Sequence, residues 1–193
     1  FEPLEFLIKA IKRSKLRPER DVMISLDVAS SEFYKKHKYY LGSPKKYFSS
    51  EEMVSFLADI VKKYPIFSIE DGCAEDDWIG WKKLNSLIGD KTLTVGDDLF
   101  VTNMDRLEKG IKKNVANTIL VKPNQIGTLS ETLDTINLAK ENKIETIISH
   151  RSGETEDNFI ADLAVGSNSK MIKTGSVTRS ERCSKYNRLL IIE

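Results

Sequence analysis

Short runs of valine, isoleucine and leucine alternate along the chain with longer stretches in which apolar residues recur every three or four positions. The short runs have the length of buried strands, and the longer stretches have the period of helices that bury one face. This alternation is typical of repeated βα units around a parallel sheet, so we predict an α/β fold. The runs predicted as strands are 22–26, 66–69, 93–95, 118–121, 145–148 and 171–172.

The longer stretches carry helix signals of their own. Ser49 and Glu52 have the spacing of a capping box ahead of an apolar stripe, which predicts a helix start there. The segment 37–46 contains Gly42, Pro44 and many lysines, and we predict that it is a loop. No low-complexity linker interrupts the pattern, so we expect a single domain. Other predicted helices lie around 6–11, 78–87 and 129–139.

Polar and charged residues stand at or next to the carboxyl end of each predicted strand. Function in parallel βα folds sits at this edge of the sheet, so these side chains are candidates for one site. Successive candidates are mostly about one βα unit apart along the chain, with an insertion after the first. They are Asp27, Glu70, Asp97, Lys122, Ser149-His150 and Lys173.

The first three candidates are carboxylates. Asp27, Glu70 and Asp97 would repel one another at one edge unless a cation lay between them. Oxygen ligands supplied singly from separate strands suit Mg²⁺, which keeps further positions for water and substrate. The alternative is that each acid ends a strand in solvent or caps a helix. That explanation is adequate for any one of these acids alone. It is weaker for three acids that stand at equivalent positions after three strands.

Two lysines end later strands of the same predicted edge. Lys122 and Lys173 could serve as a base, or as cations for a phosphate or carboxylate. Most of the other lysines are better explained as solvated surface residues. That explanation is weaker for Lys122, because Val121 and Pro123 flank it.

The stretch 149–157 combines several groups that bind anions. Arg151 offers a planar fork for phosphate, and Ser152 offers a hydroxyl and a backbone N–H. Gly153 would permit a tight turn and close backbone approach. Glu156–Asp157 would suit the first turn of a helix whose positive end faces the site. A bland loop would explain the acids and the glycine, but not a His-Arg-Ser run after an apolar strand.

Composition narrows the classes of function. The 193 residues carry 30 Lys and Arg against 29 Asp and Glu, a net charge of +1, which gives no general attraction to nucleic acid. We expect no direct nucleic-acid binding, and the basic loop is interpreted as solvated. Two cysteines are too few for a disulfide framework, and no apolar run has the length of a membrane span.

Several strings of the sequence are typical of one protein family. The string Ser-His-Arg-Ser-Gly-Glu-Thr-Glu-Asp at 149–157 resembles a signature of the enolase family. Other strings resemble that family in order over essentially the whole chain, which makes the resemblance far more specific than one short motif. These strings lie at 26–34, 68–71, 96–103, 121–128, 172–176 and 185–190.

The resemblance implies a TIM-type (β/α) barrel of the enolase kind, here incomplete with about six of its strands. Residues 1–193 would be part of the carboxy-terminal catalytic barrel domain, without the family's amino-terminal lid domain and first barrel strands. We expect such a fragment to be inactive alone. The implied activity is the reversible, Mg²⁺-dependent dehydration of 2-phosphoglycerate to phosphoenolpyruvate in glycolysis and gluconeogenesis.

The resemblance also assigns roles to residues. Asp27, Glu70 and Asp97 resemble the carboxylates that hold Mg²⁺, with Glu70 and Asp97 also near the substrate. Lys122 is similar to the base that removes the α-proton, and Lys173 to the lysine that engages the substrate carboxylate. The implied substrate-binding loop consists of Ser149, His150, Arg151 and Ser152.

Two alternatives stay open. A member of the wider superfamily acting on another carboxylic acid would generally lack the 149–157 string. A non-catalytic interaction or scaffold role is the other alternative, and loss of a candidate residue such as Asp27 or Lys122 would have favoured it. The family further implies a homo-oligomer, commonly a homodimer, and a cytoplasmic protein with surface or secreted display known among its members.

Overall fold

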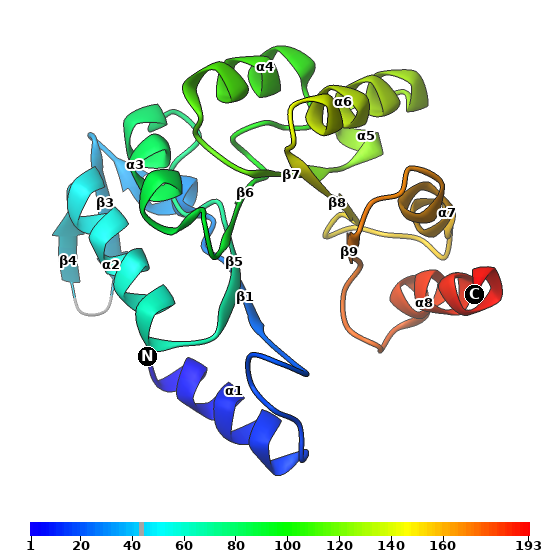
Figure 1. Ribbon diagram of the computed structural model, residues 1–193, viewed down its shortest axis with the longest axis horizontal. Coiled ribbons are helices and arrows are strands. Elements are labelled where there is room, and N and C mark those ends of the chain that lie inside the picture. The colour runs from blue at the N-terminus through cyan, green and yellow to red at the C-terminus, as the bar shows by residue number, and fades with distance from the viewer. Residues whose placement is uncertain (43–44) are drawn as a thin grey trace. The chain divides into compact units, whose positions relative to one another are not determined.

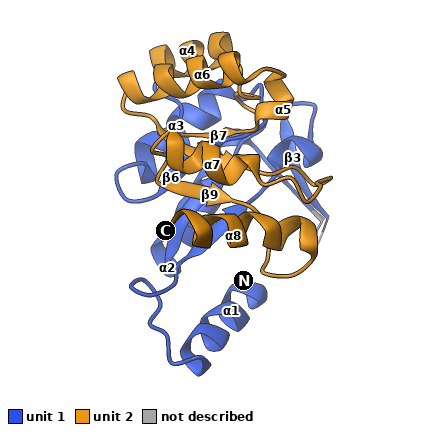
Figure 2. Ribbon diagram, turned by 90° about the vertical axis from the view of Figure 1, so that its right-hand side faces the viewer, with its two compact units in different colours: residues 1–98, 114–116 blue, residues 99–113, 117–193 orange. Residues whose placement is uncertain are grey.

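The computed structural model describes residues 1–42 and 45–193. The chain folds into two compact units, coloured separately in Figure 2. Unit 1 is Phe1–Asp98 with Asn114–Ala116, and unit 2 is Leu99–Lys113 with Asn117–Glu193. The single domain expected from the sequence stays a prediction.

Unit 1 contains three strands paired in parallel, with β1 beside β5 and β5 beside β6 (Figure 1). They are β1 (Ile24–Asp27), β5 (Ile66–Glu70) and β6 (Leu93–Gly96). The helices of this unit are α1 (Glu2–Arg13), α2 (Ser50–Lys63) and α3 (Trp78–Ile88). The predicted capping box starts α2, because Ser49 Oγ accepts the Glu52 N–H at 3.2 Å and Glu52 Oε2 accepts the Ser49 N–H at 2.8 Å.

Unit 2 repeats the same arrangement. Strands β7 (Thr118–Val121), β8 (Glu145–Ser149) and β9 (Met171–Lys173) pair in parallel in chain order. The strand β7 is buried along its whole length, which explains its continuous apolar sequence. The helices are α4 (Met104–Lys113), α5 (Pro123–Ile126), α6 (Leu129–Glu141), α7 (Phe159–Gly166) and α8 (Ser180–Ile192).

The predicted strands are therefore all present, each with one or two residues of difference at an end at most. The six parallel strands with intervening helices confirm the α/β class. The opening helix around 6–11 and the helices over 78–87 and 129–139 are confirmed as α1, α3 and α6. Among the described residues, no helix is both long and apolar enough to cross a membrane.

The predicted loop 37–46 is wrong over most of its length. Strands β2 (Tyr34–Lys35), β3 (Lys38–Gly42) and β4 (Lys45–Phe48) form a separate antiparallel sheet after the 3₁₀ helix Ser30–Phe33. Cross-strand tyrosines favour this pairing, since the Tyr40 and Tyr47 rings lie 4.9 Å apart. Pro44, one basis of the loop prediction, lies outside the described residues.

A buried tyrosine anchors this small sheet within unit 1. The Tyr39 side chain is fully buried, and its hydroxyl donates to Asp77 Oδ2 at 2.7 Å and accepts the Ala74 N–H at 2.9 Å. Asp77 Oδ1 accepts the Gly80 N–H at 2.9 Å and so caps α3. These long-range hydrogen bonds hold β3 in place, which local lysine and glycine content could not predict.

Candidate functional site

The predicted site residues lie at the carboxyl ends of the parallel strands, as expected. Four of them are the last residues of β1, β5, β8 and β9: Asp27, Glu70, Ser149 and Lys173. Three others directly follow β6, β7 and β8: Asp97, Lys122 and His150. The repeated βα unit therefore puts all seven at the same edge of their own strands.

The carboxylates belong to unit 1. Asp27 and Glu70 are register partners on the neighbouring strands β1 and β5, which places their backbones side by side. Glu70 and Asp97 are only 6% and 8% exposed. Their burial argues against the alternative that these two acids merely end strands in solvent.

A third buried acid, which the sequence analysis missed, organises the end of β6. Asp71 is 3% exposed, and its two carboxylate oxygens accept the N–H groups of Asp97 at 3.0 Å and Asp98 at 2.9 Å. The backbone of Asp71 has a positive φ of 44°. Burial raises the Asp71 pKa to about 8. The two backbone hydrogen bonds lower the pKa, and the negative charges of Asp98 and Asp97 raise it further.

These acids form a group of oxygen donors suited to a hard cation. One ligand oxygen from each of Asp71, Asp97 and Asp98 lies within 4.8 Å of the others. Of the three predicted ligands, Asp97 belongs to this group, whereas Glu70 directly precedes Asp71 in the chain and Asp27 is the register partner of Glu70 on β1. Among the described residues, the group contains carboxylates and neither cysteine nor histidine. This donor set fits Mg²⁺ and does not fit metals that prefer thiolate or imidazole.

The basic residues and the histidine belong to unit 2. Ser149 is the register partner of Lys173, and the His150 N–H donates to the Lys173 carbonyl at 2.9 Å. Val121 is the register partner of Ile148 on β8. The backbone of Lys122, the next residue, is therefore level with the end of β8. The Lys122 N–H donates to Thr102 Oγ1 at 2.9 Å, which fixes the backbone where the strand ends.

The environment of His150 keeps its ring neutral. Burial lowers the His150 pKa first, and the nearby charges of Arg182, Lys173 and Lys122 lower it further, while Glu154 opposes them. Because the pKa of an unperturbed histidine is near 6.5, a lowered pKa favours the uncharged imidazole at neutral pH. The ring can then donate one hydrogen bond and accept another.

The loop that follows β8 differs from the sequence prediction in where the next helix begins. Glu156–Asp157 precede α7 instead of forming its first turn, because the helix begins at Phe159, whose N–H donates to Asp157 Oδ1 at 2.9 Å. A side chain at Gly153 would meet no protein atom within 4 Å. The protein packing therefore does not itself require glycine there, and the space beside it is open.

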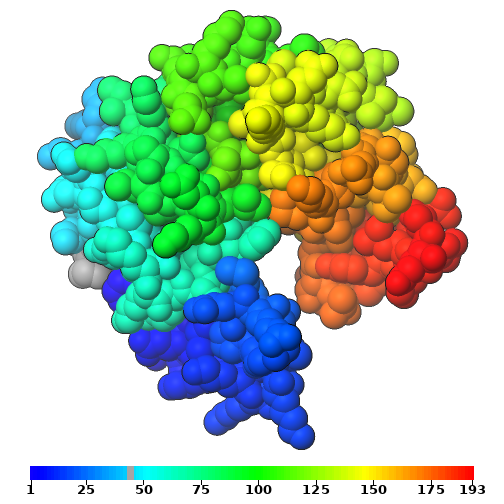
Figure 3. Space-filling model, in the orientation of Figure 1, coloured from blue at the N-terminus to red at the C-terminus, as the bar shows by residue number. Residues whose placement is uncertain are grey.

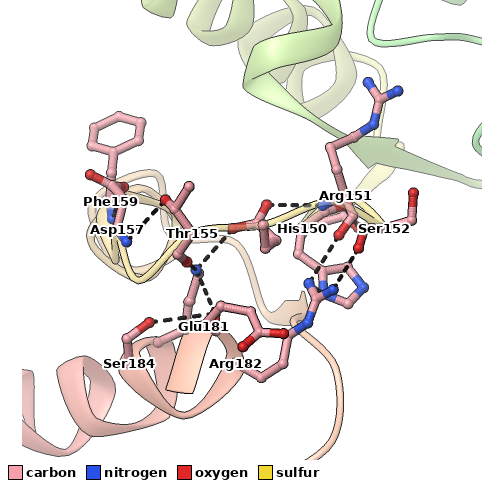
Figure 4. Close-up of polar contacts among 12 residues, drawn as sticks. His150, Arg151, Ser152, Thr155, Asp157, Phe159, Glu181, Arg182 and Ser184 are labelled. Carbon is pink, nitrogen blue, oxygen red and sulfur yellow. Dashed lines mark hydrogen bonds and ion pairs between the residues drawn. The ribbon is translucent and has the colours of Figure 1, made fainter. Parts of the chain in front are cut away.

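A cavity of about 460 Å³ adjoins this loop in unit 2. Its lining includes Ser149, Gly153 and Glu154 from the loop, and Pro123–Asn124 from the start of α5. In Figure 4 the guanidinium of Arg151 extends away from α8 and from Arg182. The strand end and the loop thus leave room for a small molecule.

Comparison with known proteins now identifies the family. A sequence profile described as "Enolase, C-terminal TIM barrel domain" matches residues 1–193. The chain belongs to the enolase family. The α/β fold with six parallel strands is therefore an incomplete TIM barrel of the enolase kind, as the resemblance implied.

A curated enolase from a Nitratiruptor species is 57% identical over 192 residues. The match covers 100% of this chain and 46% of that relative, so the chain spans about half the length of that enolase. The seven strand-end residues are at the edge where (β/α) barrels place their active sites.

Two cations on α8 were also missed from the sequence. Arg182 and Lys185 contact the 150–155 loop, although about thirty residues separate them from it. Lys185 is fully buried, which is unusual for a lysine. Nothing in the sequence around Lys185 predicts this burial. The acid directly after each of Glu70 and Asp97 was the sequence signal that could have revealed the carboxylate cluster.

Proposed function

We propose that the protein carrying this chain is a carbon–oxygen lyase that converts 2-phosphoglycerate reversibly to phosphoenolpyruvate. The observation that carries the proposal is the series of functional groups at successive strand ends in a member of the enolase family. Carboxylates end the strands of unit 1, and lysines and a histidine end those of unit 2. The proposed substrate is an anion with a phosphate, a carboxylate and a weakly acidic proton, and each of these groups has a candidate partner.

Asp27, Glu70 and Asp97 are the proposed ligands of Mg²⁺. The buried positions of Glu70 and Asp97 support this assignment, and Asp97 is also one of three acids that each have a ligand oxygen within 4.8 Å of the others. Bound Mg²⁺ would stabilise the negative charge that develops on the substrate carboxylate when the α-proton leaves. Asp71 would hold the backbone of Asp97 in place through its hydrogen bond to the Asp97 N–H.

Lys122 is the proposed base. As a neutral amine it would take the α-proton of 2-phosphoglycerate. In the second step the hydroxyl on the neighbouring carbon would leave with its bonding electrons as hydroxide, which becomes water by taking a proton from the solvent. Its backbone is fixed by Thr102, and Pro123 starts α5 directly after it, so the strand end holds the residue in a defined place. Lys173 would stabilise the substrate carboxylate as a fixed cation.

The loop after β8 is the proposed phosphate-binding element. Ser149, His150, Arg151 and Ser152 supply a hydroxyl, an imidazole, a guanidinium fork and a second hydroxyl. The open space beside Gly153 supports binding at this place, and Ser149 also lines the cavity next to the loop. A guanidinium and backbone N–H groups are suitable donors for phosphate oxygens.

The decisive experiment replaces the proposed base. In the natural full-length protein, Lys122→Ala should abolish exchange of the α-proton of 2-phosphoglycerate with deuterated solvent, followed by NMR, because no other group is assigned to take that proton. Mg²⁺ affinity, measured by calorimetry, should stay nearly unchanged. Lys113→Ala, at the exposed end of α4, is the matched control and should retain exchange. Persistent exchange in the Lys122 variant would show that the base is misassigned.

Family membership also supports a place in glycolysis and gluconeogenesis, a cytoplasmic location and homo-oligomeric assembly. These remain proposals about the natural full-length protein. Size-exclusion chromatography with light scattering tests the assembly. A monomeric mass at working concentration would refute that part.

A further inference from the structure

One face of α8 reaches the loops that follow β8 and β9. Arg182, Lys185 and Tyr186 are three and four positions apart, so they share one side of the helix. Lys185 and Arg182 bind the loop 150–155, and the Tyr186 hydroxyl donates to the Gly175 carbonyl after β9. The opposite side of α8 is at the surface, with Ile191, half a helical turn away from Arg182, 73% exposed (α8 is red in Figure 3). This helix therefore serves as a support for the site loops of unit 2.

The guanidinium of Arg182 makes three contacts with consecutive residues (Figure 4). Nη1 donates to the Arg151 carbonyl at 2.9 Å and lies 2.6 Å from His150 Nδ1, while Nη2 donates to the Ser152 carbonyl at 2.9 Å. A guanidinium has donors only, so His150 Nδ1 must be the acceptor of this contact. The proton of the neutral ring must then be on Nε2.

The same contacts orient the peptide groups of the loop. In a trans peptide the carbonyl of one residue and the N–H of the next point in opposite directions. Because the carbonyls of Arg151 and Ser152 point at Arg182, the N–H groups of Ser152 and Gly153 point away from α8. Figure 4 shows the Arg151 guanidinium on that side too.

Lys185 ties down the next part of the loop. Its buried ammonium donates to Glu154 Oε2 at 2.9 Å, to the Thr155 carbonyl at 2.6 Å and to the Glu181 carbonyl at 2.7 Å. Glu154 Oε1 in turn accepts the Arg151 N–H at 3.0 Å. Three donors meet three acceptors, so the charge is buried without loss of hydrogen bonds.

We propose that Arg182 is a positioning residue: it fixes His150 as the neutral Nε2–H tautomer and, with Lys185, turns the loop donors toward the anionic substrate. The substrate part rests on the proposed function, whereas the tautomer part stands by itself. The charged groups around His150 are Arg182 on α8, Lys173 at the end of β9, Lys122 after β7 and Glu154 in the loop. Three of these four are cations, and they oppose protonation of the ring.

The packing around Gly175 supports the proposal. A Cβ atom at this residue would lie 2.8 Å from Arg182 Cδ and 3.2 Å from His150 Cε1. The stem of Arg182 and the His150 ring are therefore pressed against the same backbone. Glycine at this position therefore leaves room for both side chains beside the backbone, and a larger residue would displace them.

The first test reads the tautomer directly in the natural full-length protein without substrate. Two-bond ¹H–¹⁵N NMR of the His150 ring, assigned with His150→Gln, should show an unprotonated Nδ1. Arg182→Met should populate the Nδ1–H form and move the His150 pKa toward its ordinary value. Arg182→Lys keeps the charge but not the fork, so it should give an intermediate mixture. An Nδ1–H ring in the unchanged protein, or an unchanged tautomer in both variants, would overturn the proposal.

The second test measures KM and kcat for 2-phosphoglycerate. Arg182→Lys should raise KM roughly 10- to 100-fold, as is usual for residues that orient a binding group. Arg188→Lys is the matched control. Arg188 is on the same helix as Arg182, but its guanidinium donates to the Asp162 carboxylate on α7 at 2.6–3.0 Å and not to the loop. It should leave KM and the tautomer unchanged. Equal KM values in both variants would reject the substrate part.

The two tests separate this inference from the proposed function. If the natural protein shows no turnover of 2-phosphoglycerate, the function is refuted, while the NMR result still decides the tautomer. Inorganic phosphate then serves as the probe, and its binding should shift the Ser152 and Gly153 amide signals less in Arg182→Lys than in the unchanged protein. Equal shifts would reject the loop orientation.

Discussion

Replacement of the buried lysine on α8 should be among the most destabilising single changes in unit 2. Lys185 is an ammonium with a 1% exposed side chain, paired with Glu154, whose side chain is 15% exposed. Lys185→Met keeps the apolar length of the side chain and removes the charge and all three donors. The substitution leaves the Glu154 carboxylate in a poorly solvated place without its cation.

The magnitude follows from that stranded charge. Breaking a buried ion pair by removing one partner costs about 3–5 kcal/mol. The carbonyls of Thr155 and Glu181 also lose a donor, at roughly 1 kcal/mol each, but these losses overlap with the first. We therefore expect Lys185→Met to lower the free energy of unfolding by about 3–5 kcal/mol at pH 7.

Denaturant unfolding of the natural full-length protein measures this loss, with circular dichroism as the probe. Lys170→Met is the matched control, because Lys170 pairs with Glu145 at 2.9 Å but is 73% exposed. The control should cost less than about 1 kcal/mol. The double variant Glu154→Gln with Lys185→Met should be more stable than the sum of the single effects predicts, because no charge is left stranded.

The destabilisation caused by Lys185→Met should also depend on pH in a definite direction. Burial works to raise the Glu154 pKa, but hydrogen bonds from Lys185 and the Arg151 N–H and the nearby cations outweigh it, so the pKa is lowered. A lowered folded-state pKa adds stability above the unfolded value near 4.5, and this stability is lost as pH falls through the folded-state pKa. The difference between the unchanged protein and Lys185→Met should shrink below about pH 4. A cost under about 1 kcal/mol at pH 7, or one independent of pH, would refute the reasoning.

Two further changes test the supports of the site. Asp71→Asn replaces one of two acceptor oxygens by an NH₂ group facing a backbone N–H, so it should displace Asp97 and weaken Mg²⁺ binding by roughly 10- to 100-fold in calorimetry. Unchanged affinity would rule out this supporting role. Gly175→Ala forces a side chain into a backbone with φ of 87° and against Arg182, so thermal unfolding should show a loss of about 1–3 kcal/mol, and wild-type stability would contradict the packing.

The local sequence was sufficient where the cause of a structure is local. The predicted strand 118–121 matches β7 at both ends, because a short run of apolar and β-branched residues is typical of a buried parallel strand, and all four residues are buried. The start of α2 was predicted because Ser49 and Glu52 satisfy the first N–H groups of that helix by themselves. The strand-end residues followed from the βα repeat, and the string 149–157 indicated the family that the comparisons then showed.

Other features depended on contacts between residues far apart in the chain. Strands β3 and β4 read as a loop because lysines and glycine are prominent in them, whereas a buried hydroxyl of Tyr39 bound to Asp77 decides their place. Asp71 looks like one more surface acid in the sequence, but its oxygens accept backbone N–H groups 26 and 27 residues further along the chain. In both cases burial and a distant partner override the local preference of the segment.

The division is clearest in the loop after β8. The sequence determined which groups this loop carries, including His150 and Arg151. The residue types alone show which side chains can donate hydrogen bonds to a phosphate. It could not determine which ring nitrogen of His150 holds the proton or where the loop N–H groups point. Arg182 decides both from 32 residues away. A hydrogen bond has a direction only when both partners have fixed places, and only the tertiary fold fixes residues that distant in sequence.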